Sequence, residues 1–282
     1  MKRTNFACLV VTTALAVLFT SGCDKLRSRD QLNQGVVAFK NAKFADAVEH
    51  FKTAIQLDPT NSNGKLYLAT SYMSQWIPGA DSPENKQLAA SAKDEFLDVL
   101  KDAPGDKTAL ASLASIAYNQ AQAMSAEEKA KKFDEAAEWY KKLIAVDPNN
   151  KEAYYSLGVI AWAKWYPALM TARAKLGMKP EAPGPIKDQK VKEELKAQYL
   201  PMIDEGIQNL HKALDIDKEY DDAMAYLNLL IREKADLADN PDEYKKQTEI
   251  ADNWVQKALD TKKLKASRVP SGATGINNGT SR

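Results

Sequence analysis

Hydrophobic positions recur along this chain at the period of an α-helix, most clearly in the stretch 133–148. There Ala136, Tyr140 and Leu143 stand at i, i+4 and i+7, so they form one apolar stripe along a helix. Pro148 is expected to end that helix, because proline has no backbone N–H to donate and restricts the residue before it. The sequence therefore predicts an amphipathic helix with a proline stop.

The same stripe returns along the chain, and this recurrence indicates a repeat protein. Its other copies are Ala47-Phe51-Ala54, Ala92-Phe96-Val99, Gly206-Leu210-Ala213 and Ala251-Val255-Ala258, with Pro59 and Pro104 following the first two. A partner helix precedes each copy, marked by a large apolar residue and then a small one. Small residues on both helices let the two backbones approach closely. They are Gly35, Ala69, Ala114 and Gly158 on the first helix, and Ala47, Ala92, Ala136 and Gly206 on the second.

These paired patterns resemble the tetratricopeptide repeat (TPR). Its helix A carries Leu-Gly/Ala-x-x-Tyr and its helix B carries Ala-x-x-x-Phe-x-x-Ala-x-x-x-x-Pro. The resemblance covers about residues 28–265 and implies an all-α fold, an α-α superhelix (TPR-like solenoid) of about five helix pairs. We expect the repeats at 28–61, 62–106, 107–150, 151–220 and 221–265.

The later repeats are longer than the usual TPR of about 34 residues, and the surplus lies between helix A and helix B. Cap signals at Ser82-Pro83, at Ser125 with Glu128 and at Asn240-Pro241 predict longer helices there rather than loops. We therefore expect elongated inserts that lengthen both helices of a pair.

The insert of the fourth repeat, residues 166–201, differs because the segment 177–185 is rich in glycine and proline and cannot be a regular helix. Helical patterns flank this break, and Pro201 is expected to restart helix B. The insert either binds a partner or only decorates the surface.

The beginning of the chain reads as an export signal. Lys2 and Arg3 precede an apolar run from Phe6 to Phe19 that is short for a membrane span. The stretch Phe19-Thr20-Ser21-Gly22-Cys23 resembles the lipobox of bacterial lipoproteins, with Thr20 where leucine is commonest. The resemblance implies cleavage of a signal peptide, residues 1–22, and acylation of Cys23. The alternative is an uncleaved signal anchor.

The expected domain plan follows from this signal. Residues 23–27 are a lipid-anchored linker, 28–265 form the TPR-like superhelical domain, and 266–282 are a disordered tail rich in Gly, Ser, Thr and Asn. We expect a protein exported and lipid-anchored in the bacterial cell envelope, with the repeat domain facing the periplasm. The choice between inner and outer membrane stays open.

Composition narrows the function. Hydrophobic residues make up 44% and charged residues 27%, as in ordinary globular proteins. Without residues 1–22 the chain loses Lys2 and Arg3, which leaves 37 basic against 38 acidic residues, or −1. This balance gives no electrostatic footprint for nucleic acid. Cys8 lies in the signal, so Cys23 would be alone and no internal disulfide is expected.

We expect no catalytic site, no cofactor and no metal. The chain has no GxSxG, no phosphate-binding glycine loop and no HExxH. His50 and His211 fall on helix B of different repeats, where packing or surface roles are expected rather than metal binding.

Partner binding is expected on the A helices, which line the concave face in TPR arrays. Four positions after the small residue of each helix A, a ladder of Phe39, Met73, Tyr118 and Trp162 would face this groove, if the ladder is not used for packing between repeats. The candidate groove residues are Leu32, Val36, Phe39, Leu66, Met73, Tyr118, Tyr155, Trp162 and Arg232. A chaperone-type carboxylate clamp is not expected, because Leu32 and Val36 stand in its region.

The sequence thus predicts a non-enzymatic protein–protein interaction scaffold or assembly factor of the bacterial cell envelope. It would bind partner peptides or helices of other envelope proteins in the concave groove. One alternative is a periplasmic receptor for glycan or another small ligand, with Tyr155, Trp162 and Trp165 as stacking surfaces. A more remote alternative is an enzyme with a site in the 166–201 insert.

Overall fold

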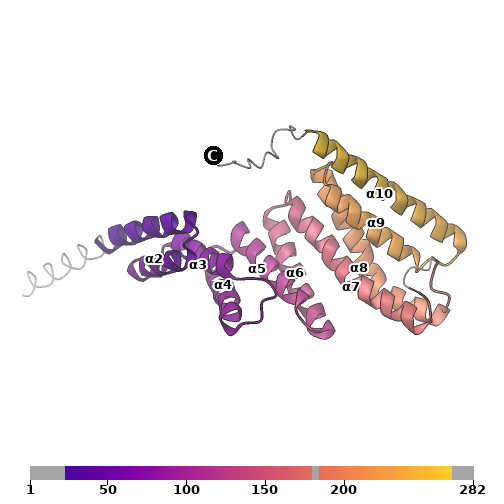
Figure 1. The fold of residues 1–282 in the computed structure, drawn as a ribbon, viewed down its shortest axis with the longest axis horizontal. Coiled ribbons are helices and arrows are strands. Elements are labelled where there is room, and N and C mark those ends of the chain that lie inside the picture. Colours follow the sequence, from indigo (N-terminus) through magenta and orange to yellow (C-terminus); the bar gives the residue numbers. More distant parts are fainter. Residues whose placement is uncertain (1–22, 180–183, 269–282) are drawn as a thin grey trace, which may run out of the picture. The chain divides into compact units, whose positions relative to one another are not determined.

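The structure is a computed structural model that describes residues 23–179 and 184–268, so the predicted signal peptide lies outside the described residues. The described residues are helical apart from short connections, and they contain no strand (Figure 1). This confirms the predicted all-α class. Among them, no helix combines the length and apolar character that a membrane span requires. The chain divides into two compact units, Met1–Trp139 and Tyr140–Arg282.

The first unit is built from consecutive helices that pack on their neighbours along the chain. They are a helix at residues 23–40, α2 (Phe44–Leu57), α3 (Ser62–Gln75), α4 (Pro83–Asp102), α5 (Lys107–Gln122) and the part of α6 (Ala126–Val146) up to Trp139. Phe51, Phe96 and Phe133 are almost completely buried. Phe51 and Phe96 belong to the repeated helix B stripe, and Phe133 lies one turn before its third copy, so Phe133 and the stripes of the first two pairs contribute to the core of this unit.

The second unit contains the rest of α6 and four further helices. They are α7 (Lys151–Lys175), α8 (Gln189–Ile216), α9 (Asp221–Ala235) and α10 (Pro241–Arg268). Helix α7 pairs with α8 and α9 with α10, while α9 also packs on α7. Their shared core includes Trp165, Leu169, Ile203, Leu210 and Leu227, each fully buried.

The predicted cap signals begin long helices, as expected. Ser82 caps α4 by accepting the N–H of Asn85, and Pro83 is the first residue of that helix. Ser125 bonds Glu128 at 2.7 Å just before α6. Asn240 accepts the N–H of Glu243 at 2.8 Å at the start of α10. The Ser82 and Asn240 side chains satisfy N–H groups that have no helical partner, so α4 and α10 begin at these caps.

Pro201 does not restart helix B, contrary to the prediction, because α8 runs through it without a break. Leu195 and Ile203, on either side, are buried in the core and hold both halves of the helix in line. Pro201 itself is exposed, as is Ala197, whose carbonyl loses its helical partner. That carbonyl can bond water instead, so a proline on the solvent face is tolerated.

At the two ends of the repeat domain, the helices reach beyond the predicted repeat boundaries. Residues 23–27, predicted as a linker, are helical and continuous with the helix that reaches residue 40. Helix α10 extends to Arg268, three residues into the stretch predicted as a tail. Residues 269–282 lie outside the described residues.

Glycines let the helix pairs of the second unit approach closely. A Cβ on Gly158 of α7 would lie 2.4 Å from Cγ of Leu210 on α8, and one on Gly206 would lie 2.6 Å from Cβ of Ala161. Both distances are far below van der Waals contact. These distances confirm the predicted close approach of helix A and helix B for the pair formed by α7 and α8.

Gly158→Ala should lower the free energy of unfolding by about 1–3 kcal/mol, because the new methyl group overpacks the α7–α8 contact. This loss opposes the gain of ~1 kcal/mol that alanine brings to a helix. Gly64→Ala is the control, since its Cβ would lie 3.2 Å from Ile55. Urea unfolding should separate the two variants, and equal stabilities would contradict the close approach.

Candidate functional site

The predicted groove residues of the first unit are half-buried and rest against its core. Leu32, Val36 and Phe39 pack on the cluster around Phe51. Leu66 and Met73 pack on the cluster around Phe96. Tyr118 places its ring centroid 5.5 Å from that of Phe133. Much of each side chain is therefore used for packing within the unit.

In the second unit, five aromatic rings form a continuous row, here called the aromatic ladder. Successive ring centroids are 5.0, 5.6, 5.7 and 5.2 Å apart, within the usual range for interacting rings. In order, its members are Tyr220, Tyr155, Tyr226, Trp162 and Tyr166. The ladder thus joins two predicted groove residues, Tyr155 and Trp162, through Tyr226 of α9.

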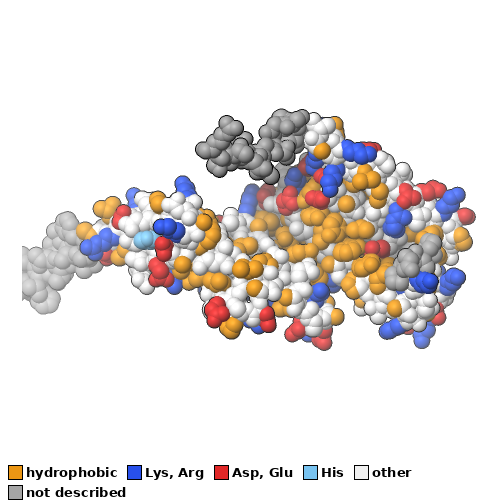
Figure 2. Space-filling model, in the orientation of Figure 1, with side chains coloured by type: hydrophobic (Ala, Val, Ile, Leu, Met, Phe, Trp, Pro, Cys, Tyr) orange, Lys and Arg blue, Asp and Glu red, His pale blue; other side chains and the backbone are white. Residues whose placement is uncertain are grey.

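Helical spacing explains why the ladder forms. On α7, Tyr155, Trp162 and Tyr166 are separated by seven and four residues, so they share one face. The ring plane of Tyr226 on α9 makes an angle of 81° with those of both Tyr155 and Trp162. Figure 2 shows hydrophobic side chains gathered over α7 and α9 on the face that is drawn. Tyr166 is the most open member, with 37% of its surface exposed.

Glu233 lies behind the Trp162 end of the ladder. It stands seven residues after Tyr226 on α9, and its Oε1 accepts the indole N–H of Trp162 at 3.0 Å. Its Oε2 is buried and has no hydrogen-bond partner within the described part of the chain. Burial raises the pKa of Glu233 to about 7; the bond from Trp162 lowers it, and the nearby charge of Asp236 raises it further.

At the other end of the ladder, the chain supplies its own cation. Lys151 places Nζ 5.0 Å from the ring centroid of Tyr220 and 2.6 Å from a carboxylate oxygen of Asp217. The hydroxyl of Tyr220 donates to Glu152, and burial together with this carboxylate raises the pKa of Tyr220. This end therefore combines an aromatic ring, an acid and a bound basic side chain.

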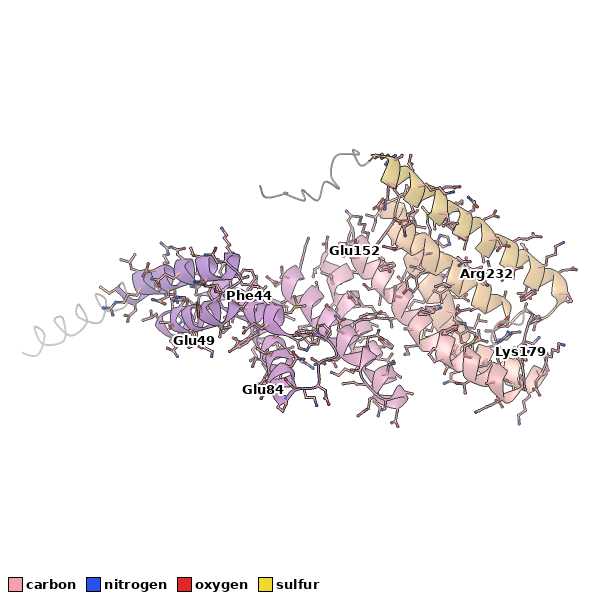
Figure 3. All side chains as sticks on the ribbon, in the orientation of Figure 1. Phe44, Glu49, Glu84, Glu152, Lys179 and Arg232 are labelled. Atoms are coloured by element: carbon pink, nitrogen blue, oxygen red, sulfur yellow. The ribbon has the colours of Figure 1, made fainter. Side chains whose placement is uncertain are left out.

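Two other predicted site residues have different roles. Arg232, labelled on α9 in Figure 3, bonds Asn228 of its own helix and Asp252 of α10, so it ties two helices together. Trp165 is fully buried in the core of the second unit. It therefore offers no stacking surface, which corrects its place in the glycan-receptor alternative.

Tyr226 and Glu233 are not among the site residues that the sequence predicts. In helix A of the fifth repeat, the family pattern indicates Arg232, one residue away from Glu233. The available signal was the seven-residue spacing of Tyr226 and Glu233, which places both on one face of α9. The same spacing separates Tyr155 from Trp162 on α7.

In the insert of residues 166–201, the described residues on either side of 180–183 are fixed to the loop between α9 and α10. Arg173 bonds Asp236 at 2.6 Å, and both side chains are nearly inaccessible. Arg173 also donates to the carbonyls of Gly184 and Lys179, each at 3.2 Å. The N–H of Ile186 donates to the carbonyl of Asp236 at 2.9 Å. The described part of the break is thus held by the fold.

Two further features bear on chemistry. Within the ranges that the structure describes, no three His, Cys, Asp or Glu side chains are grouped to hold a metal. An open hollow of about 430 Å³ lies between the helix at residues 23–40 and α2. His50 lines it and places Nδ1 2.8 Å from Oε1 of Gln31, an interaction within the fold.

Comparison with known proteins supports the fold. A family model described as TPR repeat matches residues 129–164. No curated protein matches the chain. A solved structure of MamA from Desulfovibrio magneticus RS-1, residues 41 to the end, is 14% identical, with a TM-score of 0.54 over 84% of this chain and 96% of that chain. The MamA RS-1 ArsTM double mutant is 14% identical, with a TM-score of 0.55 over 86% and 97%.

At this identity the likeness to MamA concerns the fold alone. Together with the matched repeat, it identifies a TPR-like architecture of paired antiparallel helices, as the sequence pattern predicted. TPR folds serve as protein-interaction scaffolds, so protein partners are implied at this general level.

Proposed function

We propose that this chain is a non-enzymatic scaffold or assembly factor of the bacterial cell envelope that binds a partner protein along the aromatic ladder. The ladder is the observation that carries the proposal. It lies on α7 and α9, which occupy the helix A positions of the last two predicted repeats. Partly exposed tyrosine and tryptophan rings are the side chains that most often anchor protein partners.

The envelope location is part of the same proposal and is supported by the sequence alone. The residues before Cys23 have the order of a lipoprotein signal, and Cys23 is exposed where the described helix begins. An acylated Cys23 would hold the helices near a membrane surface, where envelope partners are available.

Photocrosslinking in native membranes tests the partner site. A benzophenone amino acid at position 166 should form specific protein adducts, identified by mass spectrometry, because Tyr166 is the exposed end of the ladder. Trp162→Ala should abolish most of these adducts. The control position is 67, because Tyr67 has a similar exposed fraction of 39% but lies outside the ladder.

The outcomes separate the alternatives. Adducts that form equally from positions 67 and 166 would contradict a specific site on the ladder. If no protein adduct forms while the purified chain retains glycan, the receptor alternative is favoured instead.

Cys23→Ser tests the anchor. The substitution should abolish labelling by radioactive fatty acid, because the oxygen of serine does not replace the thioether that carries the lipid. Ser62→Ala serves as the control, since Ser62 is exposed like Cys23 but lies outside the lipobox. Labelling that persists in Cys23→Ser would remove the anchor from the proposal.

A further inference from the structure

We propose that the Trp162–Tyr166 end of the aromatic ladder binds an arginine or lysine side chain of the partner, presented by an extended segment. The inference rests on the proposed function, because it names what the partner protein presents to the ladder. Three features carry it: a carboxylate behind the rings, the arrangement at the other end of the ladder, and the length of the ladder.

The first feature is the position of Glu233 relative to the rings. Its carboxylate accepts the indole N–H of Trp162, and this bond draws negative charge toward the ring system. The face of an aromatic ring already attracts cations, and tryptophan does so best. A buried carboxylate is weakly screened by water, so its field reaches the ring surface. The exposed surface of the Trp162 and Tyr166 rings is therefore apolar and attracts positive charge.

The negative charge of the Glu233 carboxylate is also incompletely balanced by hydrogen bonds. Its Oε2 is buried without a hydrogen-bond partner among the residues that the structure describes. An uncompensated buried charge is unfavourable. A cation placed on the neighbouring rings would relieve that cost, so the free site favours a basic ligand over a neutral or acidic one.

The second feature is the same chemistry already occupied at the other end of the ladder. There the amino group of Lys151 sits over the Tyr220 ring and is paired with Asp217. The Trp162 end also brings a ring and an acid together, there through the bond from the indole N–H to Glu233. A basic side chain of a partner would lie over the rings at the Trp162 end, as Lys151 lies over the ring of Tyr220 at the other end.

The third feature decides between a peptide and a small free cation. Tyr155 and Trp162 are joined by Tyr226, and Tyr166 lies eleven residues after Tyr155 on α7. At about 1.5 Å per residue the ladder extends over ~16 Å of helix. That is the length of about five residues of extended chain. A single cation would occupy only one end, whereas an extended peptide would place apolar side chains on the tyrosines and a basic one at Trp162.

The experiment uses the full chain and defined peptides. Two acetylated pentapeptides, Leu-Ala-Tyr-Ala-Arg amide and its reverse, cover both chain directions. Each is compared with a version that has citrulline in place of arginine, which keeps the shape and removes the charge. Binding is followed by NMR through the indole N–H signal of Trp162, identified among the five tryptophans with Trp162→Phe.

At least one arginine peptide should bind roughly five- to tenfold more tightly than its citrulline version. Glu233→Gln should reduce this ratio to below about twofold, because the amide still accepts the indole N–H but carries no charge. Glu84→Gln, an equal change of net charge on α4, should leave the ratio unchanged (Glu84 is labelled in Figure 3). Binding of the arginine peptide should also weaken from pH 8 to pH 6, because protonation of Glu233 removes the charge behind the rings.

Several results would overturn the inference. These are equal affinity for the arginine and citrulline peptides, an equal loss of preference in Glu84→Gln, or no shift of the Trp162 signal at millimolar peptide. Tetramethylammonium binding as tightly as the peptide would replace it with a small-cation site. In each case, adducts from position 166 that depend on Trp162 would leave the proposed function standing, whereas their absence would remove the proposed function as well.

Discussion

Arg173→Met is expected to lower the free energy of unfolding of the second unit by about 3–5 kcal/mol. The substitution keeps a long side chain but removes the guanidinium that pairs with Asp236 at 2.6 Å. The carboxylate of Asp236 then stays buried without its counter-ion. The carbonyls of Gly184 and Lys179 lose their donor at the same time, which releases the described ends of the break from the α9–α10 loop.

Urea unfolding followed by circular dichroism measures this effect. The matched control is Arg268→Met, which breaks an exposed ion pair with Glu219 and should change stability by less than about 1 kcal/mol. Arg173→Met combined with Asp236→Leu should recover much of the loss, because no buried charge is then left alone. Equal losses in Arg173→Met and Arg268→Met would mean that the buried pair does not hold the insert.

Most of the architecture follows from short-range patterns, which is why the sequence predicts it well. The Ala136, Tyr140 and Leu143 stripe needs only the period of a helix. The cap at Ser82 needs only its own backbone neighbours. The prediction for Pro201 is wrong because the effect of this proline depends on packing with residues distant in the sequence. Proline weakens a helix because it removes one backbone hydrogen bond, yet the burial of Leu195 and Ile203 outweighs this local cost.

The site was harder to predict because it depends on which side chains of two different helices meet. Tyr155 and Trp162 were selected through the family pattern, and both belong to the ladder. Tyr226 and Glu233 come from α9, and their place beside Trp162 depends on the register between α7 and α9. No spacing within one helix reports that register. The bond from Arg173 to Asp236 likewise joins residues 63 positions apart, which no local pattern shows.

The two ends of the ladder use acidic side chains in opposite ways. At Tyr220, Glu152 and Asp217 are matched by the hydroxyl proton and by Lys151. At Trp162, Glu233 receives one indole N–H and remains partly uncompensated. At the Tyr220 end, the acidic side chains therefore already have partners in the free protein. The second end carries an energetic cost that a ligand could reduce, and this cost should be measurable without any ligand.

Glu233→Gln should therefore stabilise the protein above pH 7 and have little effect near pH 4.5. The folded-state pKa of about 7 lies above the ordinary 4.5, so the folded chain binds the proton more tightly than the unfolded chain. The free energy of unfolding then falls as pH rises from 4.5 to 7, because the wild-type carboxyl group must lose its proton while buried. A shift of this size corresponds to about 3 kcal/mol at most. Glutamine avoids this loss and still accepts the Trp162 N–H.

The measurement is urea unfolding of wild type and Glu233→Gln at pH 5 and pH 8, with the difference between the two proteins compared at each pH. Taking this difference removes the contributions of carboxyl groups common to both proteins, although Asp236, which faces Glu233 from the same turn, remains coupled to it. Glu84→Gln should show the same stability as wild type within about 0.5 kcal/mol at both pH values. A Glu233→Gln variant that is equally or less stable than wild type at pH 8 would mean that the carboxylate is already compensated, and the reason for a basic ligand at Trp162 would disappear with it.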